Sequence, residues 1–569
     1  DIIKEIIVPS NKKLIIKMSP DNVIVDPISV TGVYLERPLS NSPVITEVIS
    51  NKEIERFSNT TLIGLLEKAI PNIQIVNDSH GTTMKIQGLD SKYFLFLIDG
   101  NRMTGETTGN IDFSRLNLND IERIEIVNGG ASASYGSGAI GGVINIITKE
   151  GDSPFSVNFG TKMYSKNSDV NHFLSAKIKY KNLSSNSSLS YKGSGGYYRK
   201  YNPDLKTYSY YENDDIIDGD IVQNTFNDIS FNQSLKYKLN KKLNLYFSGL
   251  YYQHDTDDYN YNNKRRDKYY DKQYVLKIDY LIESYSANLN INFNSDNYEK
   301  FTLFEVLDEE RIRSRHQLNL FNLNFFKKIN DNYIVLGYEN YNESFYSPSD
   351  LDYNPFAGYL GSDSLKSSIL NSIFFQSEFY FSEKIQLVSG FRYDDNSIFG
   401  SHFGPHISAM YKNDNLLYRL NISKNFRSPS LKELYMSWDH LGMFYVRGNK
   451  NLLPEKSEYI SGSIEYSKSK FNLTIKPYFY YILNMIVMVE NLDNNEMINQ
   501  NVGSVHIPGL DIYAKMILGE YIRLSSTISI TDPKDIVNNI QVDGSNKIAI
   551  SNMVSIYNNN HSFNINYKY

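Results

Sequence analysis

The chain has 569 residues, a formal net charge of −6, 46 tyrosines, one tryptophan and no cysteine. The absence of cysteine excludes disulfide scaffolds and thiolate chemistry, and the acidic balance gives no electrostatic case for nucleic acid. Mean hydropathy is −0.41 and no apolar run approaches 18 residues, which excludes helical membrane spans. A membrane β-barrel stays open, because polar residues of its lumen lower the mean hydropathy. A tyrosine-rich soluble β-protein fits the composition equally well.

The first 30 residues alternate short apolar clusters with polar residues and the prolines Pro9, Pro20 and Pro27. This pattern predicts an extended, weakly anchored arm. The opening DIIKEIIVPS lacks the pattern of a signal peptide, so we expect an export signal to have been removed before residue 1.

Residues 59–71 predict a capped amphipathic helix, because Asn59 and Thr60 precede apolar residues at helical spacing and Pro71 ends the pattern. Short predicted strands with Gly and Asp turns follow. The stretch 121–149, IERIEIVNGGASASYGSGAIGGVINIITK, predicts a strand, glycine-rich turns and a second strand whose backbones approach closely.

Beyond residue 152, apolar and polar residues alternate. Ala287, Leu289, Ile291 and Phe293 interleave with asparagines, for example, and the end of the chain, HSFNINYKY, behaves in the same way. A period of two with one apolar and one polar side is typical of membrane barrel strands.

Three pieces of the first 150 residues, IQGL, FLIDGNRM and IERIEIVNG, match in order and spacing the plug domain of TonB-dependent outer-membrane receptors, which the chain closely resembles. Asn128 and Gly130 depart from the usual Arg and Pro, and the terminal Tyr569 resembles the C-terminal signal of outer-membrane barrels. The resemblance implies an all-β membrane protein of the Gram-negative outer membrane. It would be a 22-stranded antiparallel transmembrane β-barrel with an N-terminal α+β plug domain in the lumen.

The expected domains are an arm over 1–32, the plug over 33–150 and the barrel over 151–569. The resemblance implies a TonB box in the arm, which pairs as a strand with TonB, itself energised by ExbB and ExbD. An ordinary edge strand is an equally good interpretation of the candidate segment. That segment is Val23, Ile24, Val25, Asp26, Pro27, Ile28, Ser29, Val30 and Thr31.

Connections between the predicted strands come in two sizes. Short polar turns such as 412–415 and 467–470 alternate with long segments such as 255–268 and 427–456. Outer-membrane barrels place short turns on the periplasmic side and long loops outside. The segment 427–456 should therefore face the exterior.

This segment resembles the region of bacterial haem and haemoglobin receptors that carries an FRAP-type box, a histidine and an NPNL-type box. Ser428 replaces the usual Ala, Lys450 replaces the usual Pro, and His440 lies between the boxes. The two boxes are Phe426, Arg427, Ser428 and Pro429, then Asn449, Lys450, Asn451 and Leu452.

Haem iron takes a neutral imidazole as axial ligand and the porphyrin favours apolar neighbours, which His440 has in Trp438, Met443 and Phe444. The resemblance implies a second histidine on the plug, and His80 in the turn NDSHGT is the only one there. We therefore expect haem as the transported ligand, with Arg427 and Asn449 shaping the loop. The remaining histidines are interpreted as scattered surface or lumen residues: His172, His254, His316, His402, His406, His506 and His561.

Asp255, Asp257 and Asp258 could offer oxygen ligands to Ca²⁺ in the loop DTDDYNYNNKRRDKYYD, although the spacing favours a solvated charged loop. Cobalamin receptors of this fold use calcium in external loops, so a cobalamin or ferric-siderophore receptor is the alternative function.

No GxSxG, HExxH or P-loop motif indicates an enzyme, and the predicted plug argues against a passive porin or adhesin. The expected function is TonB-dependent uptake of haem from haemoproteins or a haem-carrying surface lipoprotein, in contact with outer-membrane lipid.

Overall fold

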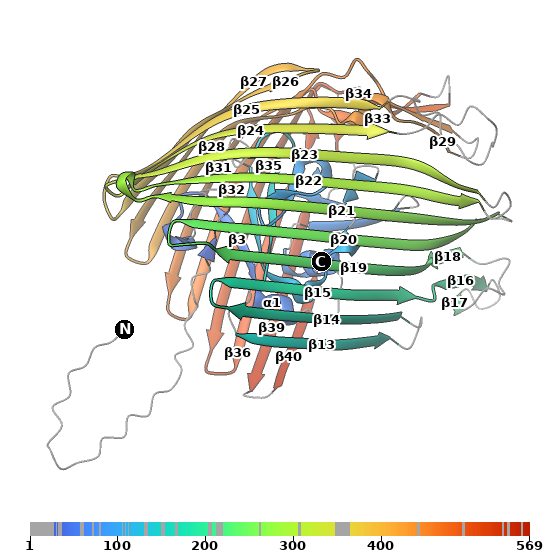
Figure 1. Ribbon diagram of the computed structural model, residues 1–569, viewed down its shortest axis with the longest axis horizontal. Helices are drawn as coiled ribbons and strands as arrows, with labels where there is room; N and C mark the ends of the chain where they lie inside the picture. The colour runs from blue at the N-terminus through green and yellow to red at the C-terminus, as the bar shows by residue number, and fades with distance from the viewer. Residues whose placement is uncertain are drawn as a thin grey trace, which may run out of the picture.

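In the computed structural model, one large assembly of strands surrounds a smaller assembly, as Figure 1 shows. No helix within the described ranges is both long and apolar enough to cross a membrane. The described residues are 28–29, 31, 37–56, 62–70, 73–78, 81–104, 106–107, 110–111, 113–129, 135–149, 154–164, 169–202, 207–211, 220–260, 263–304, 309–346, 365–440, 444–491, 495–537, 540–542, 547–558 and 561–568.

The inner assembly is the plug, a small α+β unit built around a five-stranded sheet of order β3-β11-β12-β7-β8. Its helix α2 buries Leu62, Leu65 and Leu66 on one side, as helical spacing predicts. The described elements are β1 (Ile28–Ser29), β2 (Arg37–Pro38), β3 (Thr46–Ser50), α1 (Asn51–Arg56), α2 (Leu62–Ala69), β4 (Ile73–Asp78), β5 (Gly81–Ile86), β6 (Leu89–Asp90), β7 (Phe94–Ile98), β8 (Asn101–Arg102), β9 (Glu106–Thr107), β10 (Asn110–Ile111), β11 (Ile121–Asn128) and β12 (Gly142–Thr148).

The glycine-rich stretch forms the expected strand–turn–strand, because β11 and β12 pair antiparallel from Ile121 and Thr148 to Asn128 and Gly142. Gly142 has a φ of +141°, and a Cβ there would lie 2.1 Å from the carbonyl oxygen of Val127. Only glycine permits so close an approach of two backbones.

The outer assembly is a 21-stranded sheet in which consecutive strands pair antiparallel; β37 and β38 have two residues each. The expected count of 22 strands stays a prediction. The strands are β13 (Phe155–Tyr164), β14 (Asp169–Tyr180), β15 (Leu183–Ser194), β19 (Thr225–Lys238), β20 (Leu243–Asn260), β21 (Asn263–Ile282), β22 (Ala287–Phe304), β23 (Glu309–Ile329), β24 (Asn332–Tyr346), β25 (Lys366–Tyr380), β26 (Ile385–Asn396), β27 (Gly400–Asn413), β28 (Leu416–Arg427), β31 (Glu455–Lys468), β32 (Phe471–Leu483), β35 (Ser504–Leu518), β36 (Ile522–Thr531), β37 (Lys534–Asp535), β38 (Ile540–Gln541), β39 (Ile548–Asn558) and β40 (His561–Lys568).

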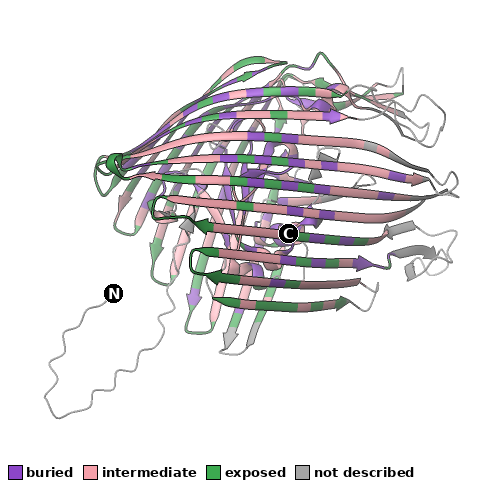
Figure 2. Cartoon of the chain, viewed as in Figure 1, coloured by how far each residue is buried: buried purple, intermediate pink, exposed green. Residues whose placement is uncertain are grey.

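The two faces of this sheet reverse the pattern of a soluble protein. In β28, Leu420 and Ile422 are exposed, whereas Arg419, Asn421 and Ser423 between and beside them are buried against the interior. The same banding of buried and exposed residues runs along most strands in Figure 2. Apolar residues outside and polar residues inside are what a barrel in lipid requires.

The sheet wraps round the plug. Near one of its ends, Ser188 of β15 donates a hydrogen bond of 2.7 Å to Asp120 of the plug, and in the last strand Lys568 donates one of 2.6 Å to the carbonyl of Ile73. Tight turns lie at one end of the strands in Figure 1, and two accessory sheets lie at the other. These are β16 (Tyr197–Asn202), β17 (Thr207–Tyr211) and β18 (Asp220–Gln223), and β29 (Ser437–His440), β30 (Phe444–Arg447), β33 (Ile486–Asn491) and β34 (Glu496–Asn501).

Candidate functional site

The segment between β28 and β31 begins with a one-and-a-half-turn helix, α4 (Leu431–Tyr435). Ser430 accepts a hydrogen bond from the backbone N–H of Glu433, whose carboxylate accepts one from the N–H of Ser430, so a capping box starts the helix. Ser428 donates its N–H to the hydroxyl of Ser137 in the plug at 3.1 Å, and Phe426 stacks on His402 at 4.2 Å. The first box therefore leads the chain from the wall onto the plug.

Arg427 is the centre of a buried charged cluster that joins wall, helix and plug. Its guanidinium donates two hydrogen bonds of 2.9 Å to Glu433, a further bond to Glu455, and lies 5.3 Å from the ring centre of Tyr93. Tyr93 donates to Glu455 at 2.8 Å, and Lys92 lies 3.5 Å from Glu433. We call Lys92, Tyr93, Arg427, Glu433 and Glu455 the ionic clasp.

The clasp changes the acidity of its members. Burial alone would raise the pKa of Glu433, but Arg427 and Lys92 outweigh it and hold this pKa at about 2. Burial, together with the negative charge of Glu455, raises the pKa of Tyr93 well above its usual value. At neutral pH Glu433 is therefore ionised and Tyr93 is neutral.

The second box closes the segment against α4. The N–H of Asn449 donates to the carbonyl of Glu433 at 2.9 Å, and its side chain donates to the carbonyl of Asn499 at 2.9 Å and accepts from the N–H of Asn451. Leu452 is buried with Leu434 and Ile486, whereas Lys450 is exposed. Residues of both boxes thus make contacts within the loop, and the loop-shaping role of Arg427 and Asn449 stays a prediction.

The two expected haem ligands are not brought together within the described part of the chain. His440 ends β29, where it is in register with Phe444 of β30, and its side chain is outside the description. His80 lies outside the described residues altogether. Ligation of haem by this pair stays a prediction.

Two histidines interpreted as scattered are paired with carboxylates on the lumen side of the wall. His254 lies 2.5 Å from Asp228, and His316 lies 2.6 Å from Glu343. Their isolation in the sequence gave no sign of these partners, which come from neighbouring strands.

The predicted long loop over 255–268 is wrong, because β20 runs to Asn260 and β21 begins at Asn263. Asp255 and Asp257 point to one face of the strand, whereas the side chain of Asp258 lies outside the description, so calcium binding by the three carboxylates stays a prediction. Asp257 pairs with Arg266 at 2.7 Å. Within the described ranges no three His, Cys, Asp or Glu residues form a group that could hold a metal ion.

The candidate TonB box is described in part. Ile28 and Ser29 form β1, which pairs with β2, and Thr31 is completely buried. The N–H of Thr31 donates to Glu125 of β11 at 2.8 Å, and its hydroxyl accepts from Asn145 of β12 at 3.0 Å. Val23, Ile24, Val25, Asp26, Pro27 and Val30 lie outside the described residues.

Sequence reasoning missed the buried ionic contacts between plug and wall. Arg115 of the plug pairs with Asp271 of β21 at 2.5 Å, and Lys476 of β32 bonds to Glu47 of β3 at 2.5 Å and lies 3.5 Å from Asp511. The barrel residues Asp271, Lys476 and Asp511 are buried at inward positions of their strands, where polar residues are ordinary in a barrel. Position alone therefore could not identify their plug partners, which are 156 residues away for Asp271 and 429 residues away for Lys476.

Comparison with known proteins agrees with this architecture. Residues 38–143 match the family described as TonB-dependent Receptor Plug Domain, and residues 160–569 match TonB dependent receptor-like, beta-barrel. The vitamin B12 transporter BtuB of Photobacterium profundum is 25% identical over 521 residues, covering 87% of this chain and 76% of that protein. The iron-regulated outer membrane virulence protein of Vibrio cholerae is 26% identical, covering 77% of this chain and 65% of its own length.

Solved structures share the fold. The ferric enterobactin receptor of Pseudomonas aeruginosa superposes with a TM-score of 0.77 at 16% identity, over 93% of this chain and 86% of that one. The alcaligin outer-membrane receptor of Bordetella pertussis gives 0.72 at 13% identity, over 97% and 93%. With plug and barrel both matched, the chain belongs to the TonB-dependent receptors, the plug-and-barrel transporters of the Gram-negative outer membrane.

Proposed function

We propose that this receptor imports a metal chelate of the cobalamin or ferric-siderophore kind. The observation that carries the proposal is the sequence match to a vitamin B12 transporter over 87% of the chain. A ferric siderophore is the second cargo of this class, because the iron-regulated relative matches over 77% of the chain. Haem, the cargo expected from the boxes and His440, has weaker support, since both boxes are occupied in folding the loop.

In this proposal the chelate binds between the loops beyond β28 and the plug surface that carries Tyr93. The ionic clasp joins that loop to the plug, so a ligand that moves the loop also loads the plug through Arg427 and Glu433. The arm then recruits TonB by strand addition, and the energy of the inner membrane displaces the plug. The receptor contributes binding and coupling, with no chemical step.

The single Trp438, in β29, offers a direct test of cargo. Selective excitation of this residue in the purified receptor should report quenching by cyanocobalamin or a ferric siderophore. We expect one of these to bind at least about tenfold more tightly than haemin, a difference of about 1.4 kcal/mol. A control variant, Trp438→Phe, should lose the signal while retaining binding measured by equilibrium dialysis.

Tighter binding of haemin than of both chelates would overturn the proposal in favour of haem. In that case a Soret shift that disappears in the double variant His440→Ala, His80→Ala would identify the two histidines as ligands.

Deletion of residues 23–31 should stop uptake and leave surface binding unchanged. Uptake that continues after the deletion would show that the TonB box lies elsewhere.

A further inference from the structure

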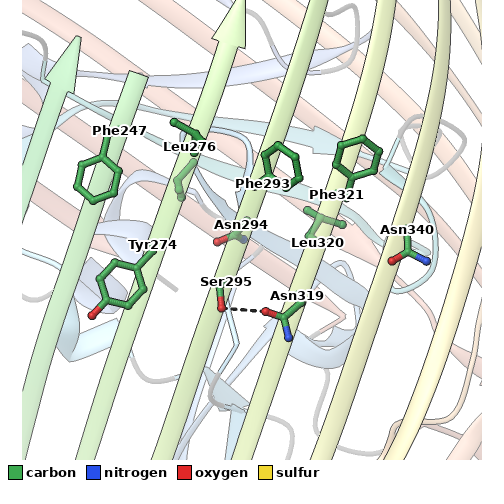
Figure 3. A pocket seen from close by; sticks show the side chains of 11 residues that line it. Phe247, Tyr274, Leu276, Phe293, Asn294, Ser295, Asn319, Leu320, Phe321 and Asn340 are labelled. Carbon is green, nitrogen blue, oxygen red and sulfur yellow. Dashed lines mark hydrogen bonds between the residues drawn. The ribbon is translucent and has the colours of Figure 1, made fainter. Parts of the chain in front are cut away.

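A groove of about 360 Å³ opens on the outer face of the barrel, away from the lumen and the plug. It crosses β20 to β24, and Figure 3 shows its side chains on these neighbouring strands. Its apolar side chains are exposed or half-buried in the membrane-facing surface: Phe247, Tyr274, Leu276, Phe293 and Phe321. The rings of Phe293 and Phe321 are tilted by 43° to each other, with their centres 4.9 Å apart.

The groove lies where the outer surface changes from apolar to polar. Along β22 the outward residues are Ile291 and Phe293 below this level and Ser295 and Asn297 at and above it. The cross-strand register puts Asn319 of β23 beside Ser295. This boundary lies on the side away from the tight turns, and therefore on the side of the outer leaflet.

Two polar side chains mark the upper edge of the groove. The hydroxyl of Ser295 donates to the amide oxygen of Asn319 at 2.9 Å, and both residues are exposed. Polar side chains facing lipid are costly without partners. An amide or ester group of a bound lipid would supply further hydrogen-bond partners at this level.

Lys272 provides a positive charge one outward position above the groove. It precedes Tyr274 by two residues on β21, so both point to the same face, and Lys272 is exposed while Asp271 and Gln273 point inward and are buried. The neighbouring Arg266 and Arg315 pair with Asp257 and Glu299. Lys272 makes no ion pair within the described residues.

We propose that this groove is a binding site for the phosphorylated, multiply acylated glycolipid of the outer leaflet. One acyl chain lies between Tyr274 and Phe293, the amide-linked part of the lipid faces Ser295 and Asn319, and a phosphate binds Lys272. The apolar floor, the polar edge and the cation follow one another in the order of acyl chain, linkage and phosphate in such a lipid. The inference depends on the membrane location alone and is independent of the imported cargo.

The test uses the full-length receptor, delipidated in detergent and titrated with purified lipid A, with binding measured by native mass spectrometry. Lys272→Gln should weaken binding about fivefold, as expected for one cation near an anionic lipid. Ser295→Trp, which fills the groove, should abolish the tightest binding. The control is Lys424→Gln, an exposed outward lysine of β28 above Leu420 and Ile422 that does not line this groove and already pairs with Glu458 at 2.7 Å.

Equal loss in Lys424→Gln and Lys272→Gln would overturn the proposal, because it would show general attraction to charge. Phosphatidylglycerol or phosphatidylethanolamine binding as tightly as lipid A would also overturn it, because any acylated lipid would then fit. Resistance of each variant to heat-induced unfolding on gels confirms that the barrel is intact.

Discussion

The plug meets the barrel wall in two different ways. Towards β15–β24 its contacts are polar: Ser188 to Asp120, Asp271 to Arg115, and Asp296 to the N–H of Thr104 at 2.9 Å. We call this the polar side. Towards β31, β32 and β35 the plug's own hydrophobic cluster continues into the wall through Tyr459, Tyr478, Tyr480, Ile482, Val505 and Ile507. We call this the apolar side, because hydrophobic contacts surround the ion pair of Lys476 with Glu47 that it also contains.

The difference determines which contacts water can replace. On the polar side, water entering the lumen can hydrogen-bond to each separated group, so breaking these contacts exposes little apolar surface. On the apolar side, separation exposes aromatic and aliphatic surface at about 25 cal/mol for each Å². No described wall residue of β15–β24 belongs to the plug's hydrophobic clusters. The plug should therefore separate from β15–β24 first and stay attached at β31–β35.

The largest effect is expected from Arg115→Ala. The substitution leaves Asp271 buried without its cation, which costs about 3–5 kcal/mol. Hydrogen exchange should rise in residues 113–120 and stay unchanged in β32. The double variant Arg115→Met, Asp271→Leu should recover most of the loss. Arg315→Ala, which removes an exposed ion pair with Glu299, should cost less than about 1 kcal/mol; a comparable cost would show that the polar side has no special role.

A smaller loss is expected from Ile507→Ala on the apolar side. This side chain is fully buried in the shared cluster, and its truncation should cost about 3 kcal/mol. The increase in exchange should spread through β11 and β12, because the wall and the plug core are one cluster there. Ile530→Ala, at an exposed position of β36, is the control with little expected effect. Exchange confined to β35 would contradict the continuity of the core.

Thr31→Val tests the arm rather than the wall. The change removes the acceptor of Asn145 and keeps the N–H bond to Glu125, so we expect a loss of about 1–2 kcal/mol. Binding of a TonB fragment should become tighter, as measured by calorimetry, because the arm is more often released. Thr46→Val, whose hydroxyl makes only a bond of 3.5 Å, should leave the affinity unchanged. Weaker binding in Thr31→Val would exclude the hydrogen bonds as a restraint on the arm.

The smallest effect near neutral pH concerns the ionic clasp. The pKa of Glu433 is about 2, lowered from 4.5. Its contribution to the stability of the folded loop is therefore complete above pH 4.5 and is lost as the pH falls through about 2. Pepsin cleavage between 428 and 454, divided at each pH by the cleavage of an unfolded reference substrate, should be constant down to pH 4.5 and increase below it. Glu433→Gln should be cleaved equally at all these pH values. An increase already at pH 6 would contradict the assignment.

Much of the architecture could be predicted because local patterns carry it. Alternation along β22 and β40 identified barrel strands, and the glycines between β11 and β12 indicated a close approach that Gly142 makes next to Val127. These features depend on residues near one another in the chain. The count of 22 strands came from the family, and alternation could not supply it.

The site was less predictable because its partners are distant. Arg427 and Glu433 are only six residues apart, so a role of this box in shaping the loop could be expected from the sequence. Tyr93, by contrast, joins the cluster through Glu455, which is 362 residues away in the chain. The loop over 255–268 failed for another reason. Its many charged residues indicated a solvent-exposed loop. In the structure, opposite charges in register, such as Asp257 and Arg266, stabilise a long hairpin.

The attachment of Thr31 has a mechanical consequence. Glu125 and Asn145, which hold it, are directly opposite one another in β11 and β12, in the middle of the plug's sheet. A pull along the arm thus loads the two hydrogen bonds of this one residue before it loads the ladder between the strands. Two hydrogen bonds break under less tension than a ladder of many bonds that share the load. A pull from TonB should therefore release Thr31 while the sheet keeps its shape. Only a sustained pull would reach the plug core.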